Sequence, residues 1–439
     1  MKAQYLEEIA RFVLDEASRL GASDANVSIA ADSSVGTGVR KGDVEELQGA
    51  HGQQLSFRSF VGKNSATTST SDFRRQALTR MVRDNVAMAR AAEPDPTAGL
   101  PDRQYLATSI PDLKLVDPAA ASFTVQEQIA AALTAEAAAF AADARITNSE
   151  GASFSTSTAV VVYGNSLGFL GSYARSRFLL SVSVVASDST GMQVGGWWTT
   201  GRNLSALETP ESVGRRAALE ATRRLGARRV KSQQVPVVFD PQMAGRLMGQ
   251  FVSAAGGGYI YRKSSFLADK LSEIVASPIV TIIDDALISG GLSSRPFDDE
   301  GLPGSTRTIV QDGRLETYLL GSYAGRKLGM APNGAGTSNL YLKAGTATPE
   351  EIIASVGNGL YLQSVSGPGF NVVTGDYSLG AAGLWIDNGQ LAYPVEGITV
   401  AGNMLDMFAS IEVVGNDLVF RSSYAAPTLK IASMTVAGE

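Results

Sequence analysis

The first 230 residues repeat one order of secondary-structure elements, and this repeat constrains the fold more than any other feature. In the first copy, an amphipathic helix is followed by short alternating stretches and a second helix over about Asp72–Ala91. In the second copy, a helix from Thr124 to about Ala142 is followed by strand-like runs and a helix that begins after Thr209. We therefore expect an α+β fold with tandem helix–antiparallel-strands–helix repeats in the N-terminal half.

Local signals mark the ends of these elements. Apolar residues from Leu6 to Leu20 recur at helical spacing, and Gly21 follows them as a helix-ending residue. Thr124-Val-Gln-Glu127 is a capping-box pattern, and Thr209-Pro210-Glu211 places a proline at the first helical position. The strand-like stretches, separated by Gly or Asn turns, are Asn26–Ala31, Gly38–Leu47, Gln54–Val61, Ser65–Thr70, Ser153–Tyr163, Gly168–Arg175, Phe178–Ser187 and Met192–Thr199.

From Val235 onward the sequence is rich in glycine and in short β-prone runs. Two helices are expected to interrupt these runs, one over roughly Pro241–Ala255 and one from the Thr348-Pro349-Glu350-Glu351 capping box to about Gly357. We therefore expect an N-terminal α+β repeat over residues 1–110, a middle α+β repeat over 111–230 and a β-rich C-terminal domain over 231–439.

The chain has no cysteine and one histidine, His51, and this inventory excludes several kinds of chemistry. Zinc in proteins is held mostly by Cys and His, so the chain alone cannot build a standard zinc site. Thiol nucleophiles, disulfides and iron–sulfur clusters are excluded because the chain has no cysteine. The net charge of −6, from 37 basic and 43 acidic residues, argues against a nucleic-acid-binding surface.

The sequence shows no membrane span and no export signal. The longest apolar runs, such as Ala159–Tyr163 and Ile279–Ile283, are the length of a strand and far too short for a spanning helix. Acidic residues from Glu7 to Glu16 interrupt the apolar positions near the N-terminus. We expect a cytoplasmic protein with no membrane contact.

Two acidic clusters are candidates for chemistry. Asp284-Asp285 follows an apolar strand, and Asp298-Asp299-Glu300 follows Arg295 in a loop. Grouped carboxylates can bind Mg²⁺ or Ca²⁺, or can act as a general acid–base pair. The alternative, which we favour, is that they cap turns, accept hydrogen bonds from loop amides and pair with Arg295 or Arg307.

Other features are weaker indications of function. His51 is expected in a glycine-containing turn between two strands, where a surface position is more typical than a catalytic one. Trp197 and Trp198, and the pair Tyr259 and Tyr261, could line a peptide groove or pack between domains. No G-x-S-x-G elbow, S-x-x-K pair or phosphate-binding loop is present, and the glycine-rich stretches are typical of turns.

A series of motifs, most specific in the last 200 residues, runs along essentially the whole chain. The motifs are Gly42-Asp-Val-Glu-Glu46, Phe60-Val-Gly62, Ser69-Thr-Ser-Asp72, Ser277-Pro278, Thr281-Ile-Ile-Asp284, Ser294-Arg-Pro-Phe-Asp-Asp-Glu-Gly301, Asn371-Val-Val-Thr-Gly-Asp-Tyr-Ser378, Gly380-Ala-Ala-Gly383, Tyr393-Pro-Val-Glu396, Thr399-Val-Ala-Gly-Asn403, Val414-Gly-Asn-Asp417 and Ala426-Pro-Thr-Leu429. Together they resemble the TldD/PmbA family, and within it the PmbA (TldE) branch, which lacks the HExxxH zinc motif.

TldD-type members resemble zinc metallopeptidases with an H-E-x-x-x-H helix and a further ligand from near the C-terminus. The equivalent helix here places Met248, Gly249 and Ser253 where the histidine, the glutamate and the second histidine would stand. A thioether, a hydrogen atom and a hydroxyl cannot replace these groups. The further ligand position falls near Arg421-Ser-Ser-Tyr424. The resemblance therefore implies no catalytic residue and no metal site in this chain.

The resemblance implies a non-catalytic subunit whose TldD-like metallopeptidase partner supplies the Zn. Such complexes are associated with peptide maturation and with degradation of small or unfolded polypeptides, and the family also carries the name modulator of DNA gyrase. Candidates for a peptide channel lie in a Gly-rich loop and the polar loop after it, and they are Gly367, Gly369, Asn371, Thr374, Gly375, Asp376 and Ser378.

Two other functions stay open at the level of the sequence. The chain could be a peptide-binding module that forms a homodimer when alone and cleaves nothing. It could also be a zinc-independent hydrolase that uses Asp298, Asp299 and Glu300.

Overall fold

The computed structural model describes residues 2–438 and has the expected mixed α+β composition. The longer helices of the N-terminal half are α1 (Ala3–Arg19), α2 (Arg75–Ala91), α4 (Val125–Ala142) and α5 (Pro210–Thr222). Its strands are β1 (Asp24–Arg40), β2 (Asp43–Val61), β3 (Asn64–Thr70), β4 (Ile146–Asn165), β5 (Leu170–Asp188) and β6 (Gly191–Gly201). One-turn helices lie in the connections, at η1 (Arg103–Tyr105), α3 (Ala119–Ser122) and η2 (Leu204–Ala206).

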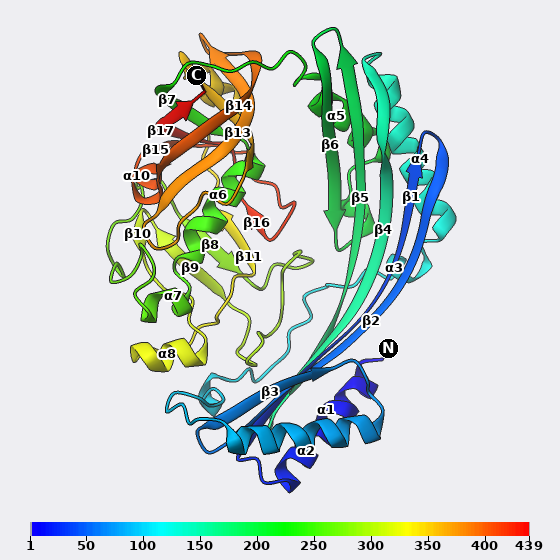
Figure 1. Cartoon of the computed structure of the whole chain (residues 1–439), viewed down its shortest axis with the longest axis vertical. Coiled ribbons are helices and arrows are strands. Elements are labelled where there is room, and N and C mark those ends of the chain that lie inside the picture. The colour runs from blue at the N-terminus through cyan, green and yellow to red at the C-terminus, as the bar shows by residue number, and fades with distance from the viewer. Residues whose placement is uncertain (1, 439) are drawn as a thin grey trace.

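These strands form one 6-stranded antiparallel sheet in the order β3-β2-β1-β4-β5-β6. The central strands β1 and β4 pair from Asn26↔Asn165 to Val39↔Ala152. Each half of the sheet has the order helix, three strands, helix, and the halves meet at β1 and β4. Figure 1 shows the sheet as a long bent surface, with α1 and α2 at one end and α4 and α5 at the other.

The strands are longer than the sequence indicated, which corrects the expected series of short strands. β1 has 17 residues and β2 has 19, and the stretches expected as two strands at 168–175 and 178–187 belong to the single strand β5. His51 lies within β2, opposite Ser33 of β1, and not in a turn. Glycine and serine resemble turn residues in a sequence, but pairing with a neighbouring strand keeps them extended here.

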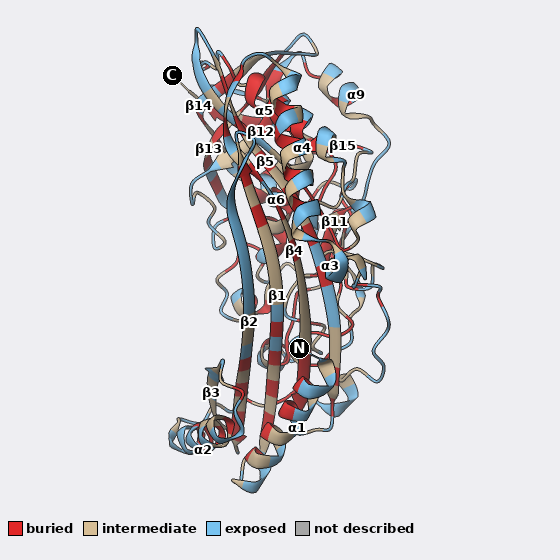
Figure 2. Cartoon of the chain, turned by 90° about the vertical axis from the view of Figure 1, so that its right-hand side faces the viewer, coloured by how far each residue is buried: buried red, intermediate tan, exposed pale blue. Residues whose placement is uncertain are grey.

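Two apolar cores hold the helices against this sheet. At one end, α1 and α2 pack on β1 and β2 in a cluster that includes Leu6, Phe57 and Val82. At the other end, α4 and α5 pack on β4 and β5 around Ala135 and Phe178. Figure 2 shows buried residues on the long strands beside these helices. The opposite face of the sheet, called the inner face below, is left for the C-terminal half.

The C-terminal half is β-rich, as expected, and contains a closed barrel. Strands β14, β13, β12, β7 and β17 are neighbours in this order, and pairing of β14 with β17 closes the barrel. A 5-stranded sheet with the order β10-β9-β8-β11-β16 lies beside it. The strands are β7 (Gln233–Phe239), β8 (Ile282–Asp285), β9 (Thr306–Gln311), β10 (Arg314–Leu315), β11 (Asn339–Leu342), β12 (Asn358–Ser366), β13 (Asp376–Asp387), β14 (Gln390–Asn403), β15 (Ile411–Val414), β16 (Tyr424–Ala425) and β17 (Leu429–Ala437). The helices are α6 (Pro241–Ser253), α7 (Gly257–Tyr261), α8 (Ser322–Leu328), α9 (Pro349–Ala354) and α10 (Met404–Ala409).

The division of the chain at residues 110 and 230 remains a prediction, and the strands on both sides of residue 110 belong to one sheet. Among residues 2–438, no helix is both long enough and apolar enough to span a membrane.

Candidate functional site

Helix α6 is the element on which the resemblance places the zinc motif, and its start is well defined. Asp240 is the N-cap residue, and its side chain accepts a hydrogen bond of 2.8 Å from the Met243 backbone N–H. Pro241 follows at the first helical position, where a missing N–H has no cost. Because these two residues fix where α6 begins, they also fix which of its side chains point toward the core and which point away from it.

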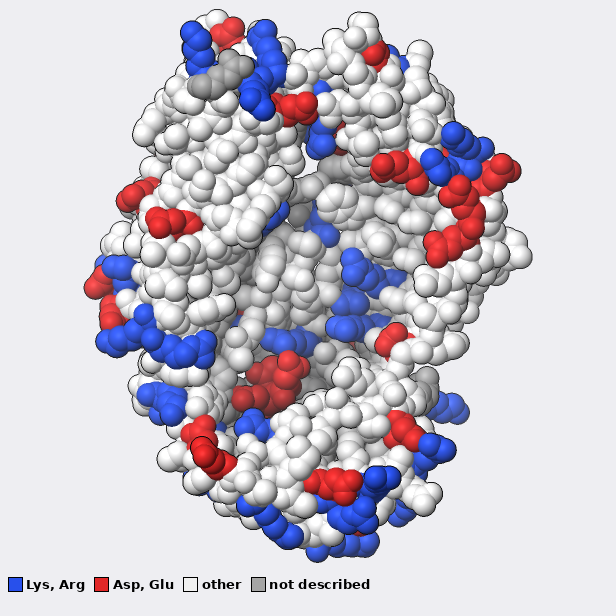
Figure 3. Space-filling model, in the orientation of Figure 1, with Lys and Arg blue, Asp and Glu red and all other residues white. Residues whose placement is uncertain are grey.

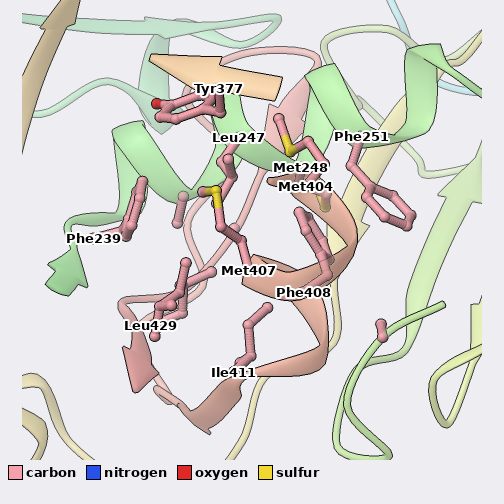
Figure 4. Close-up of a cluster of buried hydrophobic side chains, with 14 of the residues drawn as sticks. Phe239, Leu247, Met248, Phe251, Tyr377, Met404, Met407, Phe408, Ile411 and Leu429 are labelled. Atoms are coloured by element: carbon pink, nitrogen blue, oxygen red, sulfur yellow. The ribbon is translucent and has the colours of Figure 1, made fainter. Parts of the chain in front are cut away.

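One face of α6 belongs to the core of the C-terminal half. Leu247, Met248 and Phe251 are buried there, and Figure 4 shows them among the side chains of Met404 and Phe408. The Phe251 and Phe408 rings stack with centroids 4.0 Å apart. The other face of α6 is therefore the one available for a ligand.

That second face lines a cleft with a volume of about 1130 Å³. The opposite walls come from the middle of β6, from α5 and from the segment 417–428. The side chains that α6 contributes are Pro241, Gln242, Met243, Arg246, Gln250 and Ser253. Those from the other walls include Trp197, Trp198, Glu208, Ser212, Arg216, Glu220, Arg421, Ser422 and Tyr424. Segments far apart in the sequence thus meet in one cleft.

The three positions that correspond to the zinc motif have different surroundings. Met248 points into the core and is absent from the cleft wall. Gly249 lies on the wall, where a Cβ atom would be 3.0 Å from the ring of Tyr424. Ser253 also lies on the wall, and its hydroxyl donates a hydrogen bond of 2.7 Å to the Gln250 carbonyl. Tyr424 belongs to the segment Arg421–Tyr424, so this region does lie beside α6.

The donor groups at these positions do not fit a zinc ion. A buried thioether, a glycine and an already bonded hydroxyl offer none of the imidazole, thiolate or carboxylate ligands that zinc takes. Among residues 2–438, no three His, Cys, Asp or Glu side chains are grouped so that they could hold a metal ion. Glu208 and Glu220 on the cleft wall pair with arginines, as described next.

Trp197 is the centre of a charged network on the cleft wall. The guanidinium carbons of Arg421 and Arg216 lie 4.6 and 4.8 Å from the centre of its ring. Its indole N–H donates to Glu208 at 3.3 Å, and Glu208 also pairs with Arg421. These contacts connect β6 to the segment that carries Tyr424.

Asp240 is the cleft acid whose pKa is shifted. Burial raises its pKa to about 7, although the hydrogen bond from Met243 and the charge of Arg223 act in the opposite direction. Arg223 pairs with Glu220, which also pairs with Arg216 at 2.9 Å. An acid that titrates near neutral pH therefore stands at the start of α6.

The acidic loop does not form one site. Asp298 is buried and accepts hydrogen bonds of 2.9 Å from the backbone N–H groups of Glu300 and Leu302. Burial raises the pKa of Asp298. Glu300 accepts bonds of 2.7 Å from the backbone and hydroxyl of Ser322, at the start of α8. Asp299 is exposed and lines a second cavity.

Of the expected peptide-channel residues, Gly367, Gly369, Asn371, Thr374 and Gly375 lie in the connection between β12 and β13, and Asp376 and Ser378 lie at the start of β13. The Gly369 carbonyl accepts a bond of 2.7 Å from the Ser378 N–H, and the Asn371 carbonyl accepts one of 2.8 Å from the Gly375 N–H. Thr374 donates to Asp376 at 2.6 Å. Gly367 is exposed and has a φ of +93°, which favours glycine. Phe370, from this connection, lies on the wall of the cleft.

The sequence indicated some of these residues and not others. Trp197 and Trp198, noted as possible groove residues, do line the cleft, whereas His51 is exposed on β2 and is not among the residues that line it. The stacking of Arg216 and Arg421 on Trp197 had no sequence signal, because Arg421 is distant in the chain and lies in an irregular segment.

Comparison with known proteins gives a family for the whole chain. Models described as PmbA/TldA metallopeptidase domain 1, central domain and C-terminal domain match residues 26–89, 118–225 and 232–438. The metalloprotease PmbA of Escherichia coli O157:H7 is 38% identical over 437 residues, which cover 99% of this chain and 96% of that protein.

Solved structures have the same architecture. A Bacteroides thetaiotaomicron protein proposed as a modulator of DNA gyrase superposes with a TM-score of 0.93 at 28% identity, over 98% of each chain. TldE of Thermococcus kodakarensis superposes with a TM-score of 0.85 at 16% identity, over 98% of this chain and 100% of that one. The second likeness is one of fold.

Proposed function

This chain belongs to the PmbA/TldD metallopeptidase family, and we propose that it is a non-catalytic subunit whose TldD-like partner supplies the zinc. The complex would process or degrade small or unfolded polypeptides, and this chain would help to hold the extended substrate. The observation that carries the proposal is the state of α6, where Met248, Gly249 and Ser253 replace the residues of the zinc motif.

The surroundings of α6 support a binding role. Tyr424 lies over Gly249, so its ring covers the helix position from which a catalytic carboxylate would project. The cleft beside α6 has a volume of about 1130 Å³, and Trp197 and Trp198 form an aromatic part of its wall. Within residues 2–438, the buried Oε1 atom of Gln250, a residue of the cleft wall, has no hydrogen-bond partner. An unpaired buried amide oxygen is costly, and a peptide N–H would satisfy it.

The connection between β12 and β13 is part of the proposed peptide surface. Hydrogen bonds within the loop hold its shape, and Phe370 lines the cleft while its ring packs against that of Phe266, with centroids 6.5 Å apart. The acidic loop is left out of the proposal, because Asp298 and Glu300 already accept bonds from backbone N–H groups. The volume of about 1130 Å³ and the mixed lining of charged, polar and aromatic residues suit an extended polypeptide more than a small cofactor.

The test is the cleavage of an unfolded polypeptide by this chain alone, by a TldD-like chain from the same organism alone, and by the two together. We expect cleavage that requires the mixture, disappears with a chelator and is unaffected by His51→Ala. Cleavage by this chain alone would contradict the proposal. Peptide binding without cleavage in the mixture, with zinc confirmed in the TldD-like chain, would favour a binding module instead.

A further inference from the structure

A row of arginines lies on the inner face of the sheet, away from α6. Successive side chains of a strand point to opposite faces, so Tyr173, Arg175 and Arg177 of β5 share one face, with about 7 Å between neighbours. That face is the inner one, because Tyr173 and Arg175 line a cavity together with residues of the C-terminal half. Arg175 and Arg177 are exposed.

Two further arginines lie near this row. Arg295, from the loop before the acidic cluster, lines the same cavity as Arg175, with a volume of about 470 Å³. Arg202 is buried at the end of β6 and donates hydrogen bonds to the carbonyls of Ser176, Gly291 and Leu292. Figure 3 shows basic side chains gathered in the hollow between the curved sheet and the C-terminal half.

In the part of the chain that the structure describes, these arginines form no ion pair with a carboxylate, although the charge of Arg295 acts to lower the pKa of the nearby Asp298. Among residues 2–438, no carboxylate lies within 4 Å of the charged nitrogens of Arg175, Arg177, Arg202 or Arg295. Arg177 donates to the Thr200 hydroxyl at 3.0 Å, a neutral partner. Asp299 is the acid on the cavity wall, so positive charge is in excess there.

The positive charges of Arg175 and Arg177 lie close enough to Arg202 to act on the pKa of its guanidinium group. Burial, together with the neighbouring positive charges of Arg175 and Arg177, lowers the pKa of Arg202 to about 10. Like charges at such a distance destabilise the empty site and favour a bound anion. The remaining wall includes the small polar residues Ser28, Ser56, Ser293, Ser294 and Thr337.

We propose that Arg175, Arg177 and Arg295 bind a carboxylate group of a peptide that lies along the inner face of the sheet. The inference rests on the proposed function, because it extends the peptide surface from the cleft beside α6. Arg177 contacts Thr200, two positions along β6 from Trp198, which lines that cleft. Guanidinium groups bind carboxylates in a bidentate manner, which suits an acidic side chain or the C-terminus of a peptide.

The experiment measures the affinity of the full-length chain for labelled peptides of one sequence by fluorescence anisotropy. One peptide is neutral and amidated, one is neutral with a free C-terminus, and one is amidated with two glutamates. We expect Arg175→Gln with Arg177→Gln to weaken at least one carboxylate-bearing peptide about tenfold or more and to leave the amidated neutral peptide unchanged. The peptide that loses affinity shows which carboxylate is bound.

A matched control makes the same charge change on α2, with Arg80→Gln and Arg83→Gln. Both side chains are exposed, at 78% and 62%, and each pairs with Asp84. Equal losses in both double variants, or no loss in either, would overturn the inference. The inference would also be overturned if neither the free-acid peptide nor the glutamate peptide bound wild type more tightly than the amidated neutral peptide.

A second variant guards against misfolding. Arg175→Lys with Arg177→Lys keeps the charge and removes the bidentate geometry, so we expect a smaller loss of affinity than with glutamine. If inorganic phosphate bound to wild type and no peptide did, this result would also overturn the inference. Cleavage of the amidated neutral peptide by wild type mixed with a TldD-like chain tests the proposed function separately from the carboxylate site.

Discussion

The Asp284 carboxylate is fully buried and paired with Arg307, whose Nη2 lies 2.5 Å from Oδ2. Arg307 also donates hydrogen bonds to the carbonyls of Asn333, Gly334 and Gly336. One guanidinium group therefore neutralises a buried charge and fixes a glycine-rich loop. This pairing was the favoured interpretation of Asp284 from the sequence, and it gives this residue a structural role.

We predict that Arg307→Met lowers the free energy of unfolding by about 3–5 kcal/mol, because it leaves a buried carboxylate without its partner. Urea denaturation followed by circular dichroism measures the change. Arg74→Met is the control, since Arg74 pairs with Asp72 but its side chain is 85% exposed. An exposed pair contributes about 0–1 kcal/mol. Equal losses in the two variants would show that Arg307 is not needed for burial of Asp284.

Asp240 gives a prediction about pH. Its pKa in the folded chain is about 7, above the usual value of 3.8 that applies when unfolded. The folded chain therefore holds a proton that the unfolded chain releases, so stability falls as pH rises from about 4 to 7. The free energy involved is on the order of 1.4 kcal/mol for each unit of pKa shift.

Asp240→Asn should remove this loss of stability at higher pH, because asparagine keeps the N-cap hydrogen bond and carries no charge. We expect the variant to melt above wild type at pH 8 and to approach it at pH 4, in thermal unfolding followed by circular dichroism. A constant difference in melting temperature across this range would show that Asp240 is ionised throughout.

At the scale of elements, α5 packs against α4 without space for a side chain at Gly214. A Cβ atom there would lie 2.0 Å from the carbonyl oxygen of Ala135 on α4. Gly214→Ala must therefore move the two helices apart, although alanine itself favours a helix. We predict a loss of about 1–3 kcal/mol in the free energy of unfolding, measured by urea denaturation.

Gly49→Ala is the matched control for Gly214. Gly49 lies on β2, is exposed, and has no atom within 4 Å of an added Cβ. A surface substitution of this kind changes stability by no more than about 0.5 kcal/mol. If Gly214→Ala were equally neutral, the close approach of α4 and α5 would not be needed for stability.

Helix ends were predictable from the sequence, and strand lengths were not. The Thr124 capping box has both of its hydrogen bonds, and Gly21 follows α1 with a φ of +83°. Such signals are local, since the residues involved lie within one turn. The length of β2 depends instead on pairing with β1, so the glycines around His51 were mistaken for a turn.

At the scale of the whole molecule, the cleft depends on contacts that the sequence does not reveal. The zinc-motif positions could be placed on α6 by resemblance, but the burial of Met248 depends on the core around Phe408. The Trp197 network joins β6 to the segment after Asp417, more than 200 residues later. Only tertiary packing brings these segments together.

The site formed by Arg175 and Arg177 could not be predicted from the sequence for the same reason. Arg175 and Arg177 alternate along β5 like any exposed pair, and the sequence does not say which face meets the C-terminal half. The pairing of β4 with β5 and the position of Arg295 decide this. The fold class was therefore accessible from the sequence, while the sites depend on how the two halves face each other.

The central claim is that α6 of this chain holds no zinc and that a partner supplies it. The most direct test is the zinc content, by mass spectrometry, of this chain purified alone and of its copurified complex with a TldD-like chain. We expect no bound zinc in the chain alone and a single zinc ion in each complex, because a thioether, a hydrogen atom and a hydroxyl stand at the motif positions of α6. Stoichiometric zinc in this chain alone, retained after dialysis, would contradict the claim.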